Sequence, residues 1–149
     1  MFVFTILKEE IDSDPLGRGY DSMTNAEVTI SLNTVNRTRL ETLSMQELRE
    51  WTAENARGFN IMSGITNVAL TDQVRNLCYV ADKLIGTDDG QFSPGNALYV
   101  DMINNLVAAN VISNADRTAL VTKATKSLSR ATELGIGQVK EGHVQEARK

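Results

Sequence analysis

Apolar side chains recur every three or four residues along most of the chain, which is the spacing of helices with one buried face. The clearest run follows Thr71 and ends at Gly86, and its apolar face is formed by Val74, Leu77, Cys78, Ala81, Leu84 and Ile85. Shorter stripes of the same kind precede and follow it. The pattern predicts a mainly α protein, a compact single domain over residues 1–149 with six or seven short capped helices and at most one minor extended segment.

Local signals mark where these helices begin and end. A Ser, Thr or Asn side chain can accept from the free N–H groups of a first turn, and an acidic residue three positions later can bond back to form a capping box. Such starts occur at Thr24, Ser44, Asn96 and Ser113. Glycine is frequent just past the last turn, so Gly58, Gly86 and Gly135 are expected to end helices.

Two segments leave alternatives open. Residues 34–43 are rich in Thr and Arg and favour an extended connector over an edge strand. Residues 58–70 fit either a short helix or an irregular packed segment. The helix that starts after Ser113 is predicted to present Leu120, Ala124 and Leu128 on one face, with a further helical turn from Ser129 to Leu134.

A specific turn is predicted after the first helix, which carries Phe4, Leu7 and Ile11. The residue before Pro15 avoids the helical region, so the helix ends there. Gly17 and Gly19 are expected to take backbone angles closed to other residues. Arg18 between them is equally consistent with an interaction anchor and with folding back to cap the first helix.

Composition narrows the function. The chain has 149 residues, a net charge of −4, one Cys, one His and only 5% aromatic residues. Nucleic-acid binding and docking on anionic membranes both need clustered positive charge, so we expect neither a nucleic-acid nor a membrane partner. One Cys and one His cannot make a zinc site or an internal disulfide. We expect no cofactor, no metal, no small-molecule substrate and no enzymatic activity.

The remaining candidate residues have ordinary structural interpretations. His143 is expected at the surface or in a helix cap. Asp88-Asp89-Gly90 resembles a fragment of a calcium loop, but no acidic ligand stands at the twelfth position, so a turn is favoured. Glu9-Glu10 is interpreted as solvated surface. A basic stripe of Lys123, Lys126 and Arg130 suits a helix C-terminus.

The large aromatics Trp51 and Tyr20 are core residues or contact anchors, with the core favoured.

Four stretches together resemble a family of small tailed-bacteriophage proteins. They are residues 7–20, which end in Asp-Pro-Leu-Gly-Arg-Gly-Tyr; residues 23–37; residues 128–135, Leu-Ser-Arg-Ala-Thr-Glu-Leu-Gly; and residues 142–148. The resemblance implies a late, morphogenetic phage protein that is made in the bacterial cytoplasm and located in the virion. No catalytic residue is part of the pattern.

We therefore expect a non-enzymatic structural component of the phage particle, at the tail or tail-fibre base. A capsid decoration protein is the first alternative, and a non-virion late protein such as an assembly chaperone or host-factor binder is the second. The expected partners are other phage structural proteins and further copies of the chain, in a homo-oligomer or symmetric assembly. The residues expected to make these contacts are Phe2, Phe4, Arg18, Tyr20 and Phe92.

Overall fold

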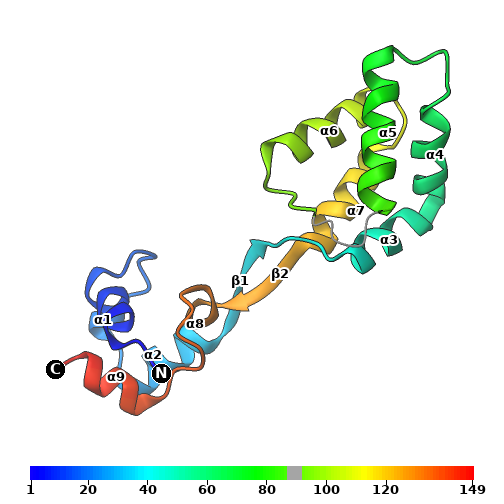
Figure 1. Ribbon diagram of the computed structural model, residues 1–149. Helices are drawn as coiled ribbons and strands as arrows, with labels where there is room; N and C mark the ends of the chain where they lie inside the picture. Colours follow the sequence, from blue (N-terminus) through cyan, green and yellow to red (C-terminus); the bar gives the residue numbers. More distant parts are fainter. Residues whose placement is uncertain (87–91) are drawn as a thin grey trace. The chain divides into compact units, whose positions relative to one another are not determined.

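The computed structural model describes residues 1–86 and 92–149, which are mainly helical as predicted (Figure 1). Their contacts divide the chain into two compact units. Unit 1 combines the two ends of the chain, Met1–Arg39 and Ser127–Lys149, and unit 2 is the central stretch Leu40–Lys126. Each unit has its own hydrophobic core. The expectation that all 149 residues fold as one domain stays a prediction.

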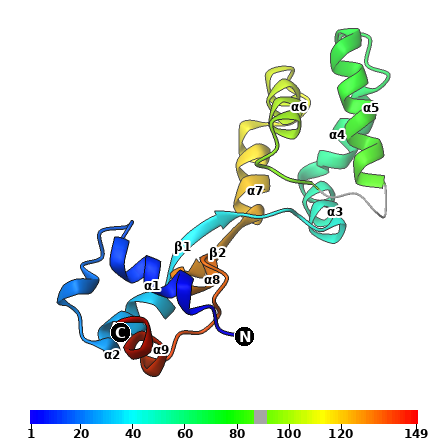
Figure 2. The ribbon, with the colours of Figure 1, turned by 60° about the vertical axis from the view of Figure 1, so that its left-hand side comes forward.

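Unit 1 is built from short helices that come from both ends of the sequence (Figure 2). They are α1 (Phe4–Ser13), the 3-10 helix η1 (Tyr20–Ser22), α2 (Asn25–Asn33), α8 (Arg130–Glu133) and α9 (Glu141–Ala147). Both α1 and α2 pack against α9. The shared core consists of Leu7, Ile11, Tyr20, Val28, Leu32, Ala131, Ile136, Val139, Val144 and Ala147.

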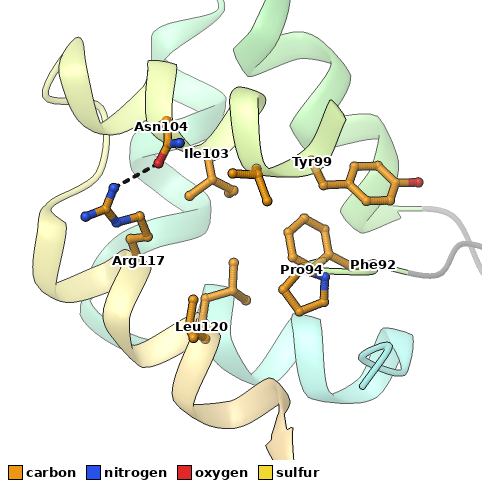
Figure 3. Close-up of a pocket in the computed structure, with 9 residues that line it drawn as sticks. Phe92, Pro94, Tyr99, Ile103, Asn104, Arg117 and Leu120 are labelled. Carbon is orange, nitrogen blue, oxygen red and sulfur yellow. Dashed lines mark hydrogen bonds between the residues drawn. The ribbon is translucent and has the colours of Figure 1, made fainter. Parts of the chain in front are cut away.

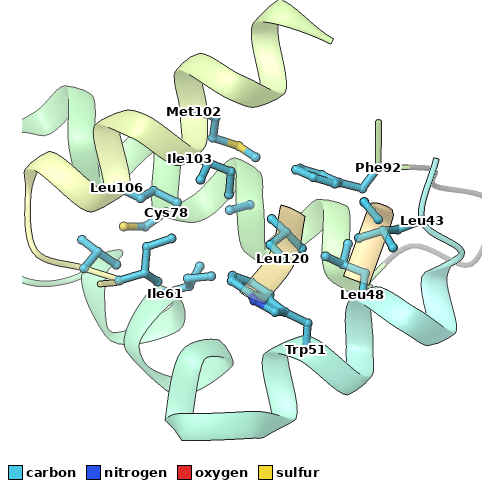
Figure 4. Close-up of a cluster of buried hydrophobic side chains, with 14 of the residues drawn as sticks. Leu43, Leu48, Trp51, Ile61, Cys78, Phe92, Met102, Ile103, Leu106 and Leu120 are labelled. Atoms are coloured by element: carbon cyan, nitrogen blue, oxygen red, sulfur yellow. The ribbon is translucent and has the colours of Figure 1, made fainter. Parts of the chain in front are cut away.

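Unit 2 contains the longest helix of the described residues and the larger of the two cores. Figure 4 shows side chains of this core. Its elements are α3 (Met45–Ala53), the 3-10 helix η2 (Glu54–Ala56), α4 (Arg57–Gly64), α5 (Asp72–Gly86), α6 (Ala97–Ala108) and α7 (Asn114–Ala124). The face predicted for residues 71–86 is confirmed. Cys78 and Ala81 are buried, and the other four apolar residues of that face pack against the same core.

Two strands pair with each other, β1 (Val35–Leu40) and β2 (Thr125–Ser129), and they run in opposite directions (Figure 1). The preference for a connector at residues 34–43 is therefore wrong, and the strand alternative is correct. The helix predicted to continue through Leu128 is also wrong, because α7 ends at Ala124. Beyond it the backbone bonds to β1, and the N–H of Glu41 donates to the carbonyl of Ala124 at 2.9 Å.

Most predicted helix starts are confirmed. The hydroxyls of Thr24, Ser44 and Ser113 each accept from the backbone N–H three residues later, and the acidic side chain there bonds back. The prediction for Gly58 is wrong. Helix α3 ends at Ala53, Asn55 and Ala56 take left-handed angles, and Gly58 lies within α4, which also accounts for most of the undecided segment 58–70.

The turn after α1 has the predicted glycine conformations. The φ angles of Gly17 and Gly19 are 61° and 80°, in the left-handed region that other residues avoid. Across the described residues, no helix is both long enough and apolar enough to cross a membrane.

Candidate functional site

The structure separates the five residues expected to contact partners. Phe2, Phe4, Arg18 and Tyr20 belong to unit 1, and Phe92 belongs to unit 2. Tyr20 and Phe92 are buried in the cores of their units. The contact role expected for these two residues is therefore corrected, while the favoured interpretation of Tyr20 as a core residue is confirmed. Both stabilise the fold from inside, as large aromatics do in a chain with few of them.

Phe2 and Phe4 do come together at the surface of unit 1, and His143 joins them. The Phe2 ring lies 5.1 Å from the Phe4 ring and 3.9 Å from the His143 imidazole, centroid to centroid. The Phe4 and His143 rings are 5.8 Å apart. Phe4 is 40% exposed, and its neighbours Met1 and Val3 are exposed as well. We call Phe2, Phe4 and His143 the aromatic cluster.

His143 also has the capping role predicted for it. Its Nδ1 atom accepts from the backbone N–H of Lys140 at 3.2 Å, at the start of α9. The same side chain therefore caps a helix and supports the two phenylalanines. Sequence reasoning missed this second contact because it joins opposite ends of the chain.

A shallow groove adjoins the aromatic cluster, between α1 and α9. It has a volume of about 590 Å³ and is lined by Phe4, Thr5, Lys8, Glu146 and Ala147. The ammonium group of Lys8 donates to the carbonyl of Ala147 at 3.2 Å and holds the two helices together at its base. The wall of the groove is mainly apolar, with Lys8 and Glu146 as its charged residues. An exposed apolar patch with charged residues at its edge is typical of protein contact surfaces.

The side chain of Arg18 makes hydrogen bonds within unit 1. Its guanidinium donates to the backbone carbonyl of Ser31 at 2.6 Å and to the amide oxygen of Asn36 at 3.3 Å. It thus closes the end of α2, and the interpretation that it caps the first helix is wrong. The turn itself is held by Asp14, whose carboxylate accepts from the backbone N–H groups of Arg18 and Gly19. Burial acts to raise the pKa of Asp14, but these hydrogen bonds outweigh it and lower the pKa.

Glu10 is not the solvated carboxylate that the sequence suggested. It is buried, and two side chains bind it. The Arg130 guanidinium binds it through two bonds of 2.9 and 2.7 Å, and the Tyr20 hydroxyl donates at 3.1 Å. Arg130 also contacts Glu133 at 3.0 Å, and Arg37 contacts Glu133 at 3.0 Å. We call these five residues the unit 1 polar network.

Hydrogen bonds and burial shift the pKa values of Glu133 and Tyr20 in this network. Hydrogen bonds from Arg37 and Arg130 lower the pKa of Glu133 to about 2. Burial, together with the nearby charge of Glu10, raises the pKa of Tyr20 to about 12. Each carboxylate is paired with a guanidinium, which suits a structural network better than proton transfer near neutral pH.

The basic stripe predicted from Lys123, Lys126 and Arg130 does not form. The helix that would align these residues ends at Ala124. Lys123 pairs with Glu50 at 3.2 Å, and Lys126 pairs with Glu47 at 2.7 Å. Three cations that are each bound to a carboxylate of their own unit do not make a phosphate-binding surface.

A small pocket opens on unit 2 between α6, α7 and the segment that precedes α6 (Figure 3). Its volume is about 60 Å³ and its wall is almost entirely apolar. The Phe92 and Tyr99 rings stack along one side with centroids 5.0 Å apart. Arg117 and Asn104 stand on the other side. The lining residues are Phe92, Pro94, Tyr99, Val100, Ile103, Asn104, Arg117, Leu120 and Val121.

The described part of the chain holds no group of three or more His, Cys, Asp or Glu side chains placed to bind a metal ion. Asp88-Asp89-Gly90, the fragment that resembled a calcium loop, lies outside the described residues. Cys78 is a buried free thiol whose pKa is raised by burial. Comparison of the chain with protein-family models, curated protein sequences and solved structures finds no match.

Proposed function

We propose that the protein is a non-enzymatic structural component of a tailed-phage virion that acts through protein–protein contacts at the tail or tail-fibre base. The source of the phage assignment is the resemblance of residues 7–20, 23–37, 128–135 and 142–148 to small tailed-phage proteins. The observation that carries a contact role is the aromatic cluster at the surface of unit 1, where Phe2 and Phe4 stand beside the groove between α1 and α9.

The cluster suits an assembly contact because its parts are already in place. The imidazole of His143 is fixed by the cap of α9 and supports Phe2 at 3.9 Å. Ordering a free side chain on binding costs about 0.5–1.5 kcal/mol, and a supported aromatic avoids part of that cost. Aromatic anchors of this kind carry much of the energy of protein interfaces.

Mass spectrometry of purified virions tests the proposal directly. We expect the chain in the particle at the low copy number of a tail component. A copy number that matches the capsid subunits would instead support the capsid decoration alternative. A chain made during infection but missing from the purified particle would overturn the virion role in favour of a non-virion late protein.

Complementation tests the contact surface. A phage that lacks the gene is supplied with Phe4→Ala, and we expect particles with little of the chain incorporated. Tyr79→Ala is the matched control, because it removes an exposed aromatic of unit 2 that is half-exposed in the same way. Equal incorporation of both variants, with both folded, would show that the aromatic cluster is not the contact.

A further inference from the structure

We infer that the pocket between α6 and α7 is a binding site for the C-terminal residue of a partner polypeptide, one that ends in a medium-sized apolar side chain and a free carboxylate. Two features of the pocket point to this occupant. They are the apolar wall and, at its edge, the charge of Arg117, which no carboxylate of the described residues neutralises.

The apolar wall sets the size of the side chain. Phe92, Ile103 and Leu120 are each less than 10% exposed, so the floor of the pocket is the core of unit 2 itself. The pocket has a volume of about 60 Å³. One water-sized group needs roughly 10–15 Å³ of such a cavity, so the pocket holds about four to six groups of that size. That matches the four carbons of a leucine side chain and excludes a large cofactor.

Arg117 supplies the charge. Its guanidinium donates to the amide oxygens of Asn104, at 2.8 Å, and of Asn114. Both acceptors are neutral, and within the described residues no carboxylate pairs with Arg117. The neighbouring Asp116 is engaged by Arg57 at 2.7 Å. A guanidinium has five N–H donors, so Arg117 can hold a ligand carboxylate while it keeps both amide contacts.

The apolar wall and Arg117 belong to one small pocket, and this favours a chain terminus over an internal acidic residue as the ligand. A C-terminal residue carries its side chain and its carboxylate on one Cα atom, so both can reach one small pocket. In an extended segment the next side chain points to the opposite side. An internal glutamate that follows an apolar residue would therefore point away from Arg117 when the apolar side chain is seated.

The test uses the full-length, nitrogen-labelled chain and the acetylated peptide Gly-Ser-Gly-Ser-Leu with a free carboxylate, followed by amide-resolved NMR. We expect saturable shifts centred on residues 99–104 and 117–121, with weak affinity in the millimolar range. The C-terminal amide of the same peptide, and a peptide ending in Gly, should each bind at least roughly tenfold more weakly.

Two variants check the assignment. Arg117→Gln and Val100→Glu should each weaken binding of the free-acid peptide by roughly tenfold, the first by removing the cation and the second by placing a negative charge at the exposed rim. Arg75→Gln, an arginine of α5 that is paired with Asp72, is the control and should leave binding unchanged. The thermal midpoint of each variant shows that it is folded.

Three results would overturn the inference. The first is no saturable shift at these residues. The second is that the C-terminal amide of the peptide, or an amidated peptide ending in Leu-Glu, binds as tightly as the free-acid peptide, and the third is that both pocket variants bind the free-acid peptide as tightly as the unmodified chain. Virion incorporation of the chain has no bearing on these outcomes, so this inference stands or fails separately from the proposed function.

Discussion

The close packing of α4 against α5 leaves no space for a side chain at Gly64. Gly64 ends α4 where Cys78 of α5 faces it, and a Cβ atom placed on Gly64 would lie 2.4 Å from the Cys78 Sγ atom. Cys78 is fully buried, so its sulfur cannot move into solvent. The absent side chain at position 64 therefore allows α4 and α5 to approach each other.

Gly64→Ala should lower the free energy of unfolding by about 1–3 kcal/mol, the usual cost of overpacking a core. Urea unfolding followed by circular dichroism measures it. Gly86→Ala, in open space at the end of α5, is the matched control and should cost much less. Combining Gly64→Ala with Cys78→Ala should reduce the cost of the glycine change, and an equal cost in both backgrounds would contradict the proposed clash.

Glu133 should make unit 1 sensitive to acid. Its pKa falls from 4.5 to about 2 in the folded chain. A carboxylate with a depressed pKa stabilises the fold above its unfolded pKa, and that stability is lost as the pH falls from 4.5 through 2. Glu133→Gln should therefore lower the thermal midpoint at neutral pH, and the difference from the unmodified chain should shrink in this acidic window.

Glu146→Gln provides the comparison for this measurement. Glu146 pairs with Lys149 at the surface, where ion pairs contribute little, so its midpoint should follow that of the unmodified chain at every pH. A Glu133→Gln deficit of the same size at neutral pH and at pH 2 would show that the loss is not electrostatic.

Among elements, the unit 1 polar network links helices that are far apart in the sequence. Arg130 at the start of α8 binds Glu10 of α1, which lies 120 positions earlier. Tyr20 of η1 and Arg37 of β1 complete the connection. Four elements therefore share one set of charges, and Glu10 at its centre is only 3% exposed.

Arg130→Met should be among the most destabilising single changes in unit 1, because it leaves the buried carboxylate of Glu10 without its cation. Breaking a buried pair from one side costs about 3–5 kcal/mol. Arg37→Met, which removes a more exposed arginine of the same network, should cost less than about 1 kcal/mol. Urea unfolding measures both, and similar losses would argue against a special role for burial.

At the scale of the molecule, unit 2 is an insertion within unit 1. The chain leaves unit 1 within β1 and returns to it within β2. Because these two strands pair with each other, the two positions at which unit 2 is inserted lie side by side. All residues of the unit 1 core lie outside the inserted stretch. Among the described residues of the stretch 40–126, none belongs to that core.

Replacing residues 41–124 by Asn-Gly should therefore leave unit 1 folded, because a two-residue turn of this sequence joins antiparallel strands well. Circular dichroism and a cooperative thermal transition measure the outcome. The same shortened chain carrying Arg130→Met should lose the transition, which shows that the native network forms. An unfolded shortened chain would support the expectation of one domain over residues 1–149.

The sequence by itself determined the helical class, most helix starts and the glycine turn at residues 15–20. These features depend on neighbours within one or two turns, as with Thr24 and Glu27. Tertiary structure alone decided the pairing of β2 with β1, the burial of Glu10, and the meeting of Phe2 with His143. Each of these depends on residues about a hundred positions apart, and no local pattern records which distant partner will satisfy a charge, an open strand edge or an aromatic ring.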